Sequence, residues 1–293
     1  MPTRKPSIYC PYLGQVISPE KSNREHIVPL SLGGANGFEI FVDRDFNSTV
    51  GSKIDGALAN DFMVAMKRQE YDAIGHSKKR PAVVSKRSKM NDNGMPVQVS
   101  LDRKNGMAIW DSVGRRYLTD KESAGRSIST QFAIERWSRL KFAAKVALGS
   151  GYFIYGEQFI KKVKHDEIRT IMNMTGQETK GDFESIKTRI YDQFSGPEEK
   201  DKNEFNVQEF LCNFANGSCV ITIPGPKNVQ FTVGVLGRFT GMLNVPAKTS
   251  EFPLDGAHDL GHAVVLQKGK IYRMSYRALL VLVKQFNHPI FRH

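Results

Sequence analysis

This sequence has little of what membrane proteins and disulfide-rich secreted proteins require. Its longest strongly apolar run, ALLVLV at residues 278–283, is far shorter than the roughly 20 residues of a membrane-spanning helix. The first residues, MPTRKPSIYCPY, lack the apolar stretch of a secretory signal. The three cysteines, Cys10, Cys212 and Cys219, cannot form an even disulfide framework. We therefore expect a cytoplasmic protein with no membrane partner, in which Cys212 and Cys219 are buried thiols.

Negative charge is also in short supply. The chain has 30 acidic and 42 basic residues, a formal net charge of +12 and a pI near 9.5. This balance favours a polyanionic partner, with nucleic acid the first candidate and a membrane surface the weaker one. Hydrophobic residues make up 40% of the 293 positions, which is enough for a core of one large domain or two modest ones.

Residues 23–58, NREHIVPLSLGGANGFEIFVDRDFNSTVGSKIDGAL, predict two short strands around a glycine turn, followed by a helix. Ile27 and Val28 end the first strand, and FEIFV forms the second. From Asp45 onward, apolar residues recur every four positions, which predicts one buried helix face. The members of this stripe are Phe46, Val50, Ile54, Leu58, Phe62 and Met66. A helix packed in this way would hold side chains of the hairpin in fixed positions.

Three polar residues around this turn suit phosphodiester hydrolysis. Such a reaction needs a base to activate water and a divalent cation to neutralise charge on the phosphate. His26 is suited to the first role because histidine titrates near neutral pH. Glu25 and Asn47 carry the hard oxygen ligands that Mg²⁺ prefers. A bland interpretation stays open, in which His26 is a structural residue and Asn47 caps the helix.

The runs REHIVPLSLGG and FNSTVGSKIDGALA resemble the HNH (ββα-metal) endonuclease family, in the branch with the pattern EHIxPxxLGG…CNxxxGxxxDxxLA. The resemblance covers about residues 7–66. It implies that His26 is the general base and that Glu25 and Asn47 hold one Mg²⁺ or Mn²⁺. We expect Asn36 to brace the loop and Asp55 to brace the helix. The products would carry 5′-phosphate and 3′-hydroxyl ends.

The chain departs from this family where many relatives bind a structural zinc through CxxC pairs. Cys10 is present without a partner pair, and the CxxC positions before the asparagine hold Asp43 and Phe46. One cysteine cannot build a tetrahedral zinc site. We therefore expect no structural zinc, with the packing of Phe46 in its place.

Basic residues concentrate after the motif. Residues 67–104 contain ten Lys or Arg and four Asp or Glu, a local excess of +6. With its Pro and Gly residues, the segment 71–104 is interpreted as a basic linker or DNA-clamping loop, with a solvated connector as the alternative. The candidate nucleic-acid-binding residues are Arg24, Lys53, Lys78, Lys79, Arg80, Lys86 and Arg87.

The remainder, residues 105–293, predicts helices over 128–174 and strands from Cys219 onward, including a hairpin around Lys268 and Gly269. The predicted fold class is α+β, with an HNH-like unit over residues 1–70 and a C-terminal α+β domain for target recognition, regulation or dimerisation. His258 and His262 have the spacing of helical metal ligands, but the flanking glycines argue against that helix. Trp110 and Trp137 are expected in the core rather than stacked on bases.

Together these features predict a metal-dependent endonuclease that cleaves DNA in preference to RNA, with a homodimer as one possible assembly. A role in bacterial or phage defence or restriction follows only by analogy. Two alternatives stay open. One is a catalytically degenerate nucleic-acid-binding protein, and the other is a nuclease effector that a ligand or partner gates.

Overall fold

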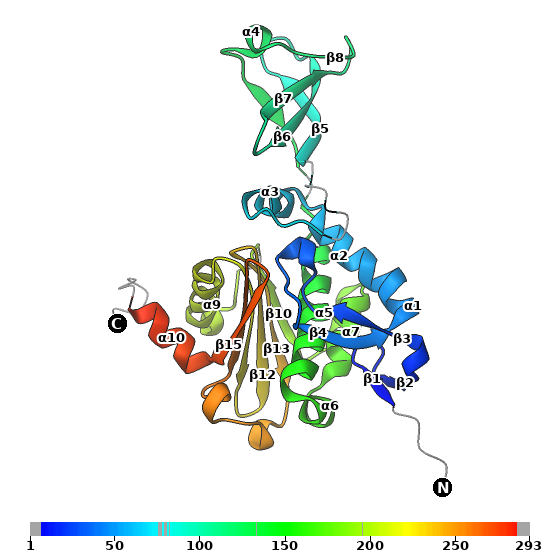
Figure 1. The fold of residues 1–293 in the computed structure, drawn as a ribbon, viewed down its shortest axis with the longest axis vertical. Helices are drawn as coiled ribbons and strands as arrows, with labels where there is room; N and C mark the ends of the chain where they lie inside the picture. The colour runs from blue at the N-terminus through cyan, green and yellow to red at the C-terminus, as the bar shows by residue number, and fades with distance from the viewer. Residues whose placement is uncertain are drawn as a thin grey trace.

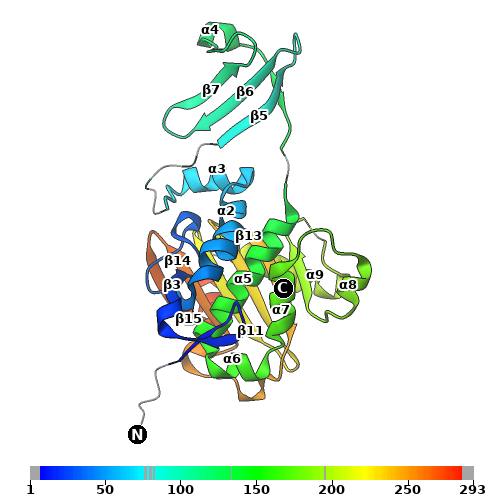
Figure 2. The same cartoon turned by 90° about the vertical axis from the view of Figure 1, so that its right-hand side faces the viewer.

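The computed structural model describes residues 7–75, 78, 81, 83–132, 134–194 and 196–285. Its fold class is α+β, as predicted. Figures 1 and 2 show a main body of helices around a β-sheet, from which a smaller β-sheet projects beyond helix α3. Within the described residues, no helix combines the length and apolar character that a bilayer crossing demands.

The N-terminal segment forms two small antiparallel ribbons. Their elements are β1 (Ile8–Cys10), β2 (Gln15–Ile17), η1 (Pro19–Lys21), β3 (Ser22–His26), η2 (Leu30–Leu32) and β4 (Glu39–Asp43). Strand β1 pairs with β2, and β3 pairs with β4. A Cβ atom on Gly34 would lie 1.8 Å from the carbonyl oxygen of Val28, so only glycine fits this close approach. The ββ part of the predicted turn is thus present.

The helix that follows is interrupted twice. Its pieces are α1 (Arg44–Phe46), the π-helical turn η3 (Asn47–Gly51), α2 (Ser52–Ala59) and α3 (Phe62–Glu70). Phe46, Ile54 and Leu58 are buried as predicted, but Met66 is 46% exposed. The prediction of one continuous helix face fails there because the Asp61 side chain accepts hydrogen bonds from two backbone N–H groups and caps a new helix.

The prediction of a basic linker over residues 71–104 is wrong, because residues 83–90 and 96–102 form two strands of the projecting sheet. This sheet has the order β8-β7-β6-β5-β9 and a core of its own, formed by Met90, Val97, Val99 and Ile109. Its elements are β5 (Val83–Met90), β6 (Pro96–Asp102), β7 (Gly106–Asp111), β8 (Arg116–Tyr117), α4 (Asp120–Ser123) and β9 (Ile128–Thr130). The boundary predicted at residue 105 falls inside the β6–β7 hairpin. The basic side chains of β5 occupy its outward positions and masked the alternation of buried residues.

The main body is built around a six-stranded antiparallel sheet with the order β10-β13-β12-β11-β14-β15. Its strands are β10 (Arg189–Asp192), β11 (Ser218–Pro224), β12 (Asn228–Val235), β13 (Arg238–Pro246), β14 (His262–Gln267) and β15 (Lys270–Ser275). The helices and 3₁₀ turns are α5 (Arg136–Tyr155), α6 (Glu157–Lys162), α7 (His165–Asn173), α8 (Lys180–Glu184), η4 (Glu199–Asp201), α9 (Lys202–Phe214), η5 (Thr249–Glu251), η6 (Gly256–His258) and α10 (Tyr276–Lys284). The predicted hairpin at Lys268 and Gly269 is confirmed, and both residues have positive φ.

Helix α5 joins the N-terminal unit to this sheet. One face of the sheet packs against α5, while α9 and α10 lie against the other (Figure 1). A single core cluster contains Phe38 and Leu58 from the N-terminal unit, Phe142 and Leu148 from α5, and Phe231 from the sheet. The described residues 7–70 therefore have no core separate from the rest, and the predicted domain boundary at residue 70 does not divide two cores. An N-terminal ββα unit on its own would lack the wall that α5 provides.

Candidate functional site

Strand β3 carries the predicted site residues, and its two faces meet different surroundings. Successive side chains of a strand point to opposite faces. Glu25 contacts Lys145 of α5, whereas His26 contacts Glu39 of the neighbouring strand β4. The predicted constellation therefore has an outer half on the His26 face of β3 and an inner half on the Glu25 face.

The outer half is centred on the imidazole of His26. Its Nε2 lies 3.0 Å from Asn36 Oδ1 and 3.1 Å from Glu39 Oε1. The β3–β4 register places His26 directly opposite Glu39. Because a carboxylate only accepts hydrogen bonds, the Nε2 atom carries a proton in this arrangement. The His26 side chain is 19% exposed, so the ring is only partly buried.

The inner half is a buried ion triad. Lys145 Nζ lies 2.5 Å from Glu25 Oε1 and 2.7 Å from Asp55 Oδ2, and the Lys145 side chain is 0% exposed. Strand β3, helix α2 and helix α5 each supply one member. Breaking such a pair leaves an uncompensated charge in the interior, which is strongly destabilising. The predicted role of Asp55 as a brace for the helix agrees with this contact.

Two carboxylates share one ammonium in this triad, and burial together with these charges shifts the pKa values of its members. Burial raises the pKa of Asp55 to about 6, and it outweighs the opposing attraction of Lys145. Although burial of Lys145 acts to lower its pKa, the nearby carboxylates raise it, so this side chain stays charged. The Tyr12 ring lies 5.6 Å from Lys145 Nζ, and burial raises the pKa of its hydroxyl.

Asn47 begins the π-helical turn η3. Its Nδ2 donates to Asn23 Oδ1 at 3.3 Å, and Asn23 shares the inner face of β3 with Glu25. A Cβ atom on Gly51 would lie 3.1 Å from Asn47 Oδ1 and 3.7 Å from Cε of Lys145. The glycine thus lets the Asn47 amide and Lys145 come close together. π-Helical turns often occur at functional sites, where they redirect a side chain.

The inner half has the donor chemistry for a small divalent cation. If Asp55 is ionised, the triad has a net charge of −1, and Asp55 Oδ1 is buried without a partner in the described structure. Glu25 uses one oxygen for Lys145 and keeps 13% of its side chain exposed. Within the described chain, no three His, Cys, Asp or Glu residues form a metal-holding group. A cation here would therefore depend on carboxylate and amide oxygens with water, as Mg²⁺ does.

The basic residues proposed for nucleic-acid binding lie on the surface where they are described. Arg24 is 73% exposed, close to Glu39 and the Phe41 ring. Lys53 is exposed on α2, Lys78 follows α3, and Lys86 and Arg87 are exposed on β5. Lys79 and Arg80 fall outside the described residues. The described members of this set are thus distributed over the β3–β4 ribbon, helix α2, the residues after α3 and the small sheet.

The lesser candidates are packed into the fold. His262 is fully buried, its Nδ1 donates to the Ala257 carbonyl at 2.7 Å, and burial lowers its pKa to about 4. Its ring stacks on His258 with centroids 4.8 Å apart. Cys212 and Cys219 are buried free thiols as predicted, with sulfurs 3.7 Å apart.

The region around Cys10 and Phe46 is filled by side chains. Cys10 is buried, and its Sγ accepts a hydrogen bond from the Asp43 backbone at 3.3 Å. Phe46 is buried as expected and packs on Tyr12, with ring centroids 5.5 Å apart. Trp110, expected in the core, is partly buried and meets Tyr117 edge-on on the small sheet.

Reasoning from the sequence missed two residues that define the site. Lys145 is the only charged residue in the stretch FAAKVALG of α5, and that isolation is a signal of a buried ion pair. Glu39 follows the glycine turn and precedes the apolar strand residues, so a register count would place it opposite His26. Neither residue matches an element of the HNH pattern.

Comparison of this chain with protein-family models, curated proteins and solved structures found no match in any of the three. Interpretation of the site therefore depends on its own residues and on the short HNH-like pattern.

Proposed function

We propose that this protein is an HNH-type endonuclease that hydrolyses phosphodiester bonds, with DNA as its substrate. The observation that carries the proposal is the part-exposed imidazole of His26, which a carboxylate orients at the end of a β-ribbon beside a helix bearing Asn47. The order strand, turn, strand and helix is also the order of the ββα motif that the sequence resembles. A formal charge of +12 supports a polyanionic substrate.

In this proposal His26 acts as general base through Nδ1. The neutral ring accepts a proton from the attacking water, and Glu39 stabilises the imidazolium that forms because its carboxylate already lies against Nε2–H. Asn36 Oδ1 holds the same nitrogen from the loop side. Glu39 and Asn36 together fix the orientation of the His26 ring, so that its Nδ1 can point at the attacking water.

On the inner face, Glu25 and Asn47 would hold one Mg²⁺ or Mn²⁺. When bound, such a cation neutralises charge on the phosphate and its leaving oxygen. Lys145 positions the Glu25 carboxylate and limits the negative charge there, while Asn23 orients the Asn47 amide. The scissile phosphate would lie over the end of β3, where it could reach both faces of the strand.

The decisive experiment measures cleavage of supercoiled and linear DNA with Mg²⁺, Mn²⁺ or chelator. We expect His26→Ala to lower the cleavage rate by about 10²- to 10⁴-fold, the usual contribution of a positioned base. DNA affinity should stay close to that of the wild type, since phosphate contacts by basic residues supply it. His258→Ala, in the η6 turn (Gly256–His258), is the matched control and should cut normally. Cleavage by His26→Ala at the wild-type rate would refute the assignment.

A nucleic-acid-binding protein without catalysis is the second candidate, and the Glu25–Lys145 ion pair favours it. That pair neutralises one of the two groups that would hold the cation. Such a protein would bind DNA with strong salt dependence, yet titration with Mg²⁺ or Mn²⁺ would produce no nicked plasmid. Metal-dependent nicking that disappears in His26→Ala would exclude it.

A further inference from the structure

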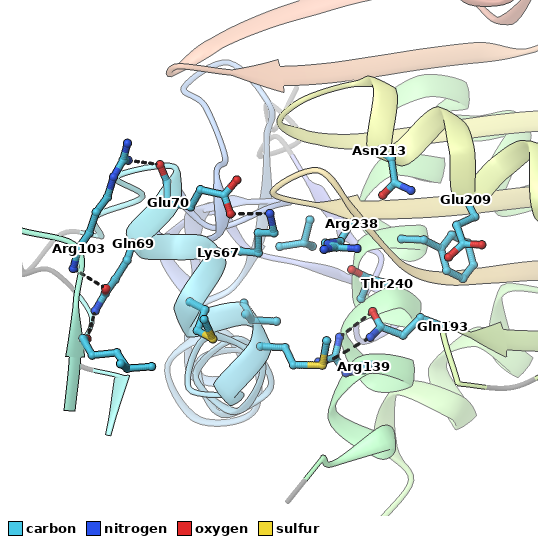
Figure 3. Close-up of a pocket in the computed structure, with 16 residues that line it drawn as sticks. Lys67, Gln69, Glu70, Arg103, Arg139, Gln193, Glu209, Asn213, Arg238 and Thr240 are labelled. Atoms are coloured by element: carbon cyan, nitrogen blue, oxygen red, sulfur yellow. Dashed lines mark hydrogen bonds and ion pairs between the residues drawn. The ribbon is translucent and has the colours of Figure 1, made fainter. Parts of the chain in front are cut away.

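A cavity of about 620 Å³ lies where three parts of the molecule meet, away from the residues discussed above. Helix α3 forms one wall, the β6–β7 side of the small sheet a second, and the β12–β13 turn with α9 the third (Figure 3). A volume of this size accommodates a small organic molecule. The HNH-like pattern does not include these walls, apart from the start of α3.

The polar lining of the cavity has an excess of positive charge. The cavity is lined by four cationic side chains and by two carboxylates, those of Glu70 and Glu209. They are Lys67, Arg103, Arg139 and Arg238. Lys67 is paired with Glu70, whose backbone carbonyl also accepts a hydrogen bond from Arg103. These six lining residues sum to +2, and Asp61, which pairs with Arg139, lowers the local charge to +1, which still favours an anionic ligand.

Two arginines keep unused hydrogen-bonding capacity at this cavity. Arg139 is 2% exposed, and its Nη2 lies 2.6 Å from Asp61 Oδ1. Its Nε is buried with no hydrogen-bond partner among the described residues. A buried guanidinium N–H without a partner is costly, which makes this atom a candidate donor to a ligand or to water. Arg238 is exposed and forms no ion pair within the described chain.

The remaining lining is apolar and adaptable. Met63 and Met66 of α3 face Val235 and Phe239 of the sheet across the cavity. Methionine side chains adjust to irregular or flat ligands, and Met63 and Met66 are 41% and 46% exposed. Phe239 is 2% exposed and lies edge-on to Phe205, so it forms the floor of this zone. The cavity thus combines an apolar zone with arginines, which bind phosphate in a bidentate manner.

We propose that this cavity binds a nucleotide, with its phosphate on Arg238 and its base against Met63 and Met66. A planar heterocycle joined to a phosphate is the small-molecule class that satisfies both zones at this volume. The site is separate from the proposed catalytic residues and stands whether or not the protein cleaves DNA.

The same cavity borders the contact that docks the small sheet on the body. Gln69 Nε2 donates to the carbonyl oxygens of Pro81 and Leu101, each at 2.8 Å, and the Arg103 backbone N–H donates to Gln69 Oε1 at 3.0 Å. Because the walls come from both sides of this contact, a nucleotide in the cavity stabilises the docked arrangement by mass action.

The test is isothermal titration of the full chain with AMP, GMP, CMP and UMP in the presence of chelator, which removes metal-dependent binding elsewhere. We expect at least one nucleotide to bind with a Kd below about 1 mM. Arg238→Gln should weaken that binding about tenfold or more, as expected for loss of a charge-assisted contact. Inorganic phosphate and the matching nucleoside should each bind more weakly than the nucleotide.

Arg115→Gln is the matched control, because Arg115 is exposed at the other end of strand β7. It should bind the nucleotide like the wild type. Met63→Glu, which places a negative charge in the apolar zone, should also abolish binding while circular dichroism stays unchanged. The proposal is overturned if no nucleotide binds at 1 mM, or if Arg238→Gln and Arg115→Gln have equal affinities. Neither result depends on DNA cleavage.

Discussion

The two faces of strand β3 differ in the group that their carboxylates contact. On the outer face, Asn36 and Glu39 contact the imidazole of His26, and the side chains of His26 and Glu39 are 19% and 16% exposed. On the inner face, Glu25 and Asp55 share the buried ammonium of Lys145. One strand thus separates groups suited to proton transfer from groups that hold the fold together.

This difference shows that adjacency in the sequence is a poor guide to a shared environment. Glu25 and His26 are neighbours, yet the environment of each is set by a different part of the chain. His26 contacts Glu39 of strand β4. Glu25 contacts Lys145 of helix α5, which lies 120 residues later in the chain. Substitutions on the inner face should therefore change the free energy of unfolding, and substitutions on the outer face should change the rate of DNA cleavage.

The largest stability effect is expected on the inner face. Lys145→Met would leave Glu25 and Asp55 buried without their cation, and we expect a loss of about 3–5 kcal/mol in the free energy of unfolding. Urea denaturation followed by circular dichroism measures it. Lys141→Met, one turn earlier on α5, should cost less than about 1 kcal/mol. A loss below that level in Lys145→Met would mean that the triad is not a structural element.

The inner face should also make stability depend on pH through Asp55. Its pKa rises from 3.8 in the unfolded chain to about 6 in the folded protein because of burial. Between these values the folded state binds more protons, so this group's contribution to stability is present below pH 4 and lost as pH rises through 6. The change amounts to at most about 3 kcal/mol.

Asp55→Asn isolates this contribution, since the other titrating groups are common to both proteins. The stability of the wild type relative to Asp55→Asn should fall as pH increases from 4 to 7, measured by urea denaturation at each pH. A difference that stays constant over this range would contradict the raised pKa of Asp55.

On the outer face, the expected effect is on rate rather than stability. Glu39→Gln keeps a hydrogen-bond acceptor at His26 but removes the charge that stabilises the imidazolium, so we expect a fall in cleavage rate of about ten- to hundredfold. Stability should change by less than about 1 kcal/mol because the pair is partly exposed. Glu157→Gln, an exposed carboxylate elsewhere, is the control. If both variants cut DNA equally fast, Glu39 does not serve the base.

The smallest effect on stability is expected for Arg24→Ala. Its guanidinium lies 3.7 Å from Glu39 and is 73% exposed, so the ion pair should contribute within about 0.5 kcal/mol. If Arg24 contacts phosphate, DNA affinity should fall and the slope of log affinity against log salt should decrease by about one. An unchanged salt slope would remove Arg24 from the DNA-contacting set.

Local features of the fold were predictable because they depend on neighbouring residues. The glycine turn between β3 and β4, the β14–β15 hairpin and the burial of Phe46 and Leu58 all follow from turn chemistry or periodicity. The end of the helix at Asp61 was missed because a stripe of apolar residues continues past the cap. The small sheet was missed because its charged outward positions suggested a linker.

The sequence by itself determined the β-β-helix order, the basic charge and the candidate set of Glu25, His26 and Asn47. Only the tertiary structure decided which of these groups share an environment. It placed Lys145 beneath Glu25 and Glu39 beside His26, and it joined residues 1–70 to the C-terminal sheet in one core. The reason is physical: a charge is stabilised by whichever groups surround it in space, and those groups come from distant parts of the chain.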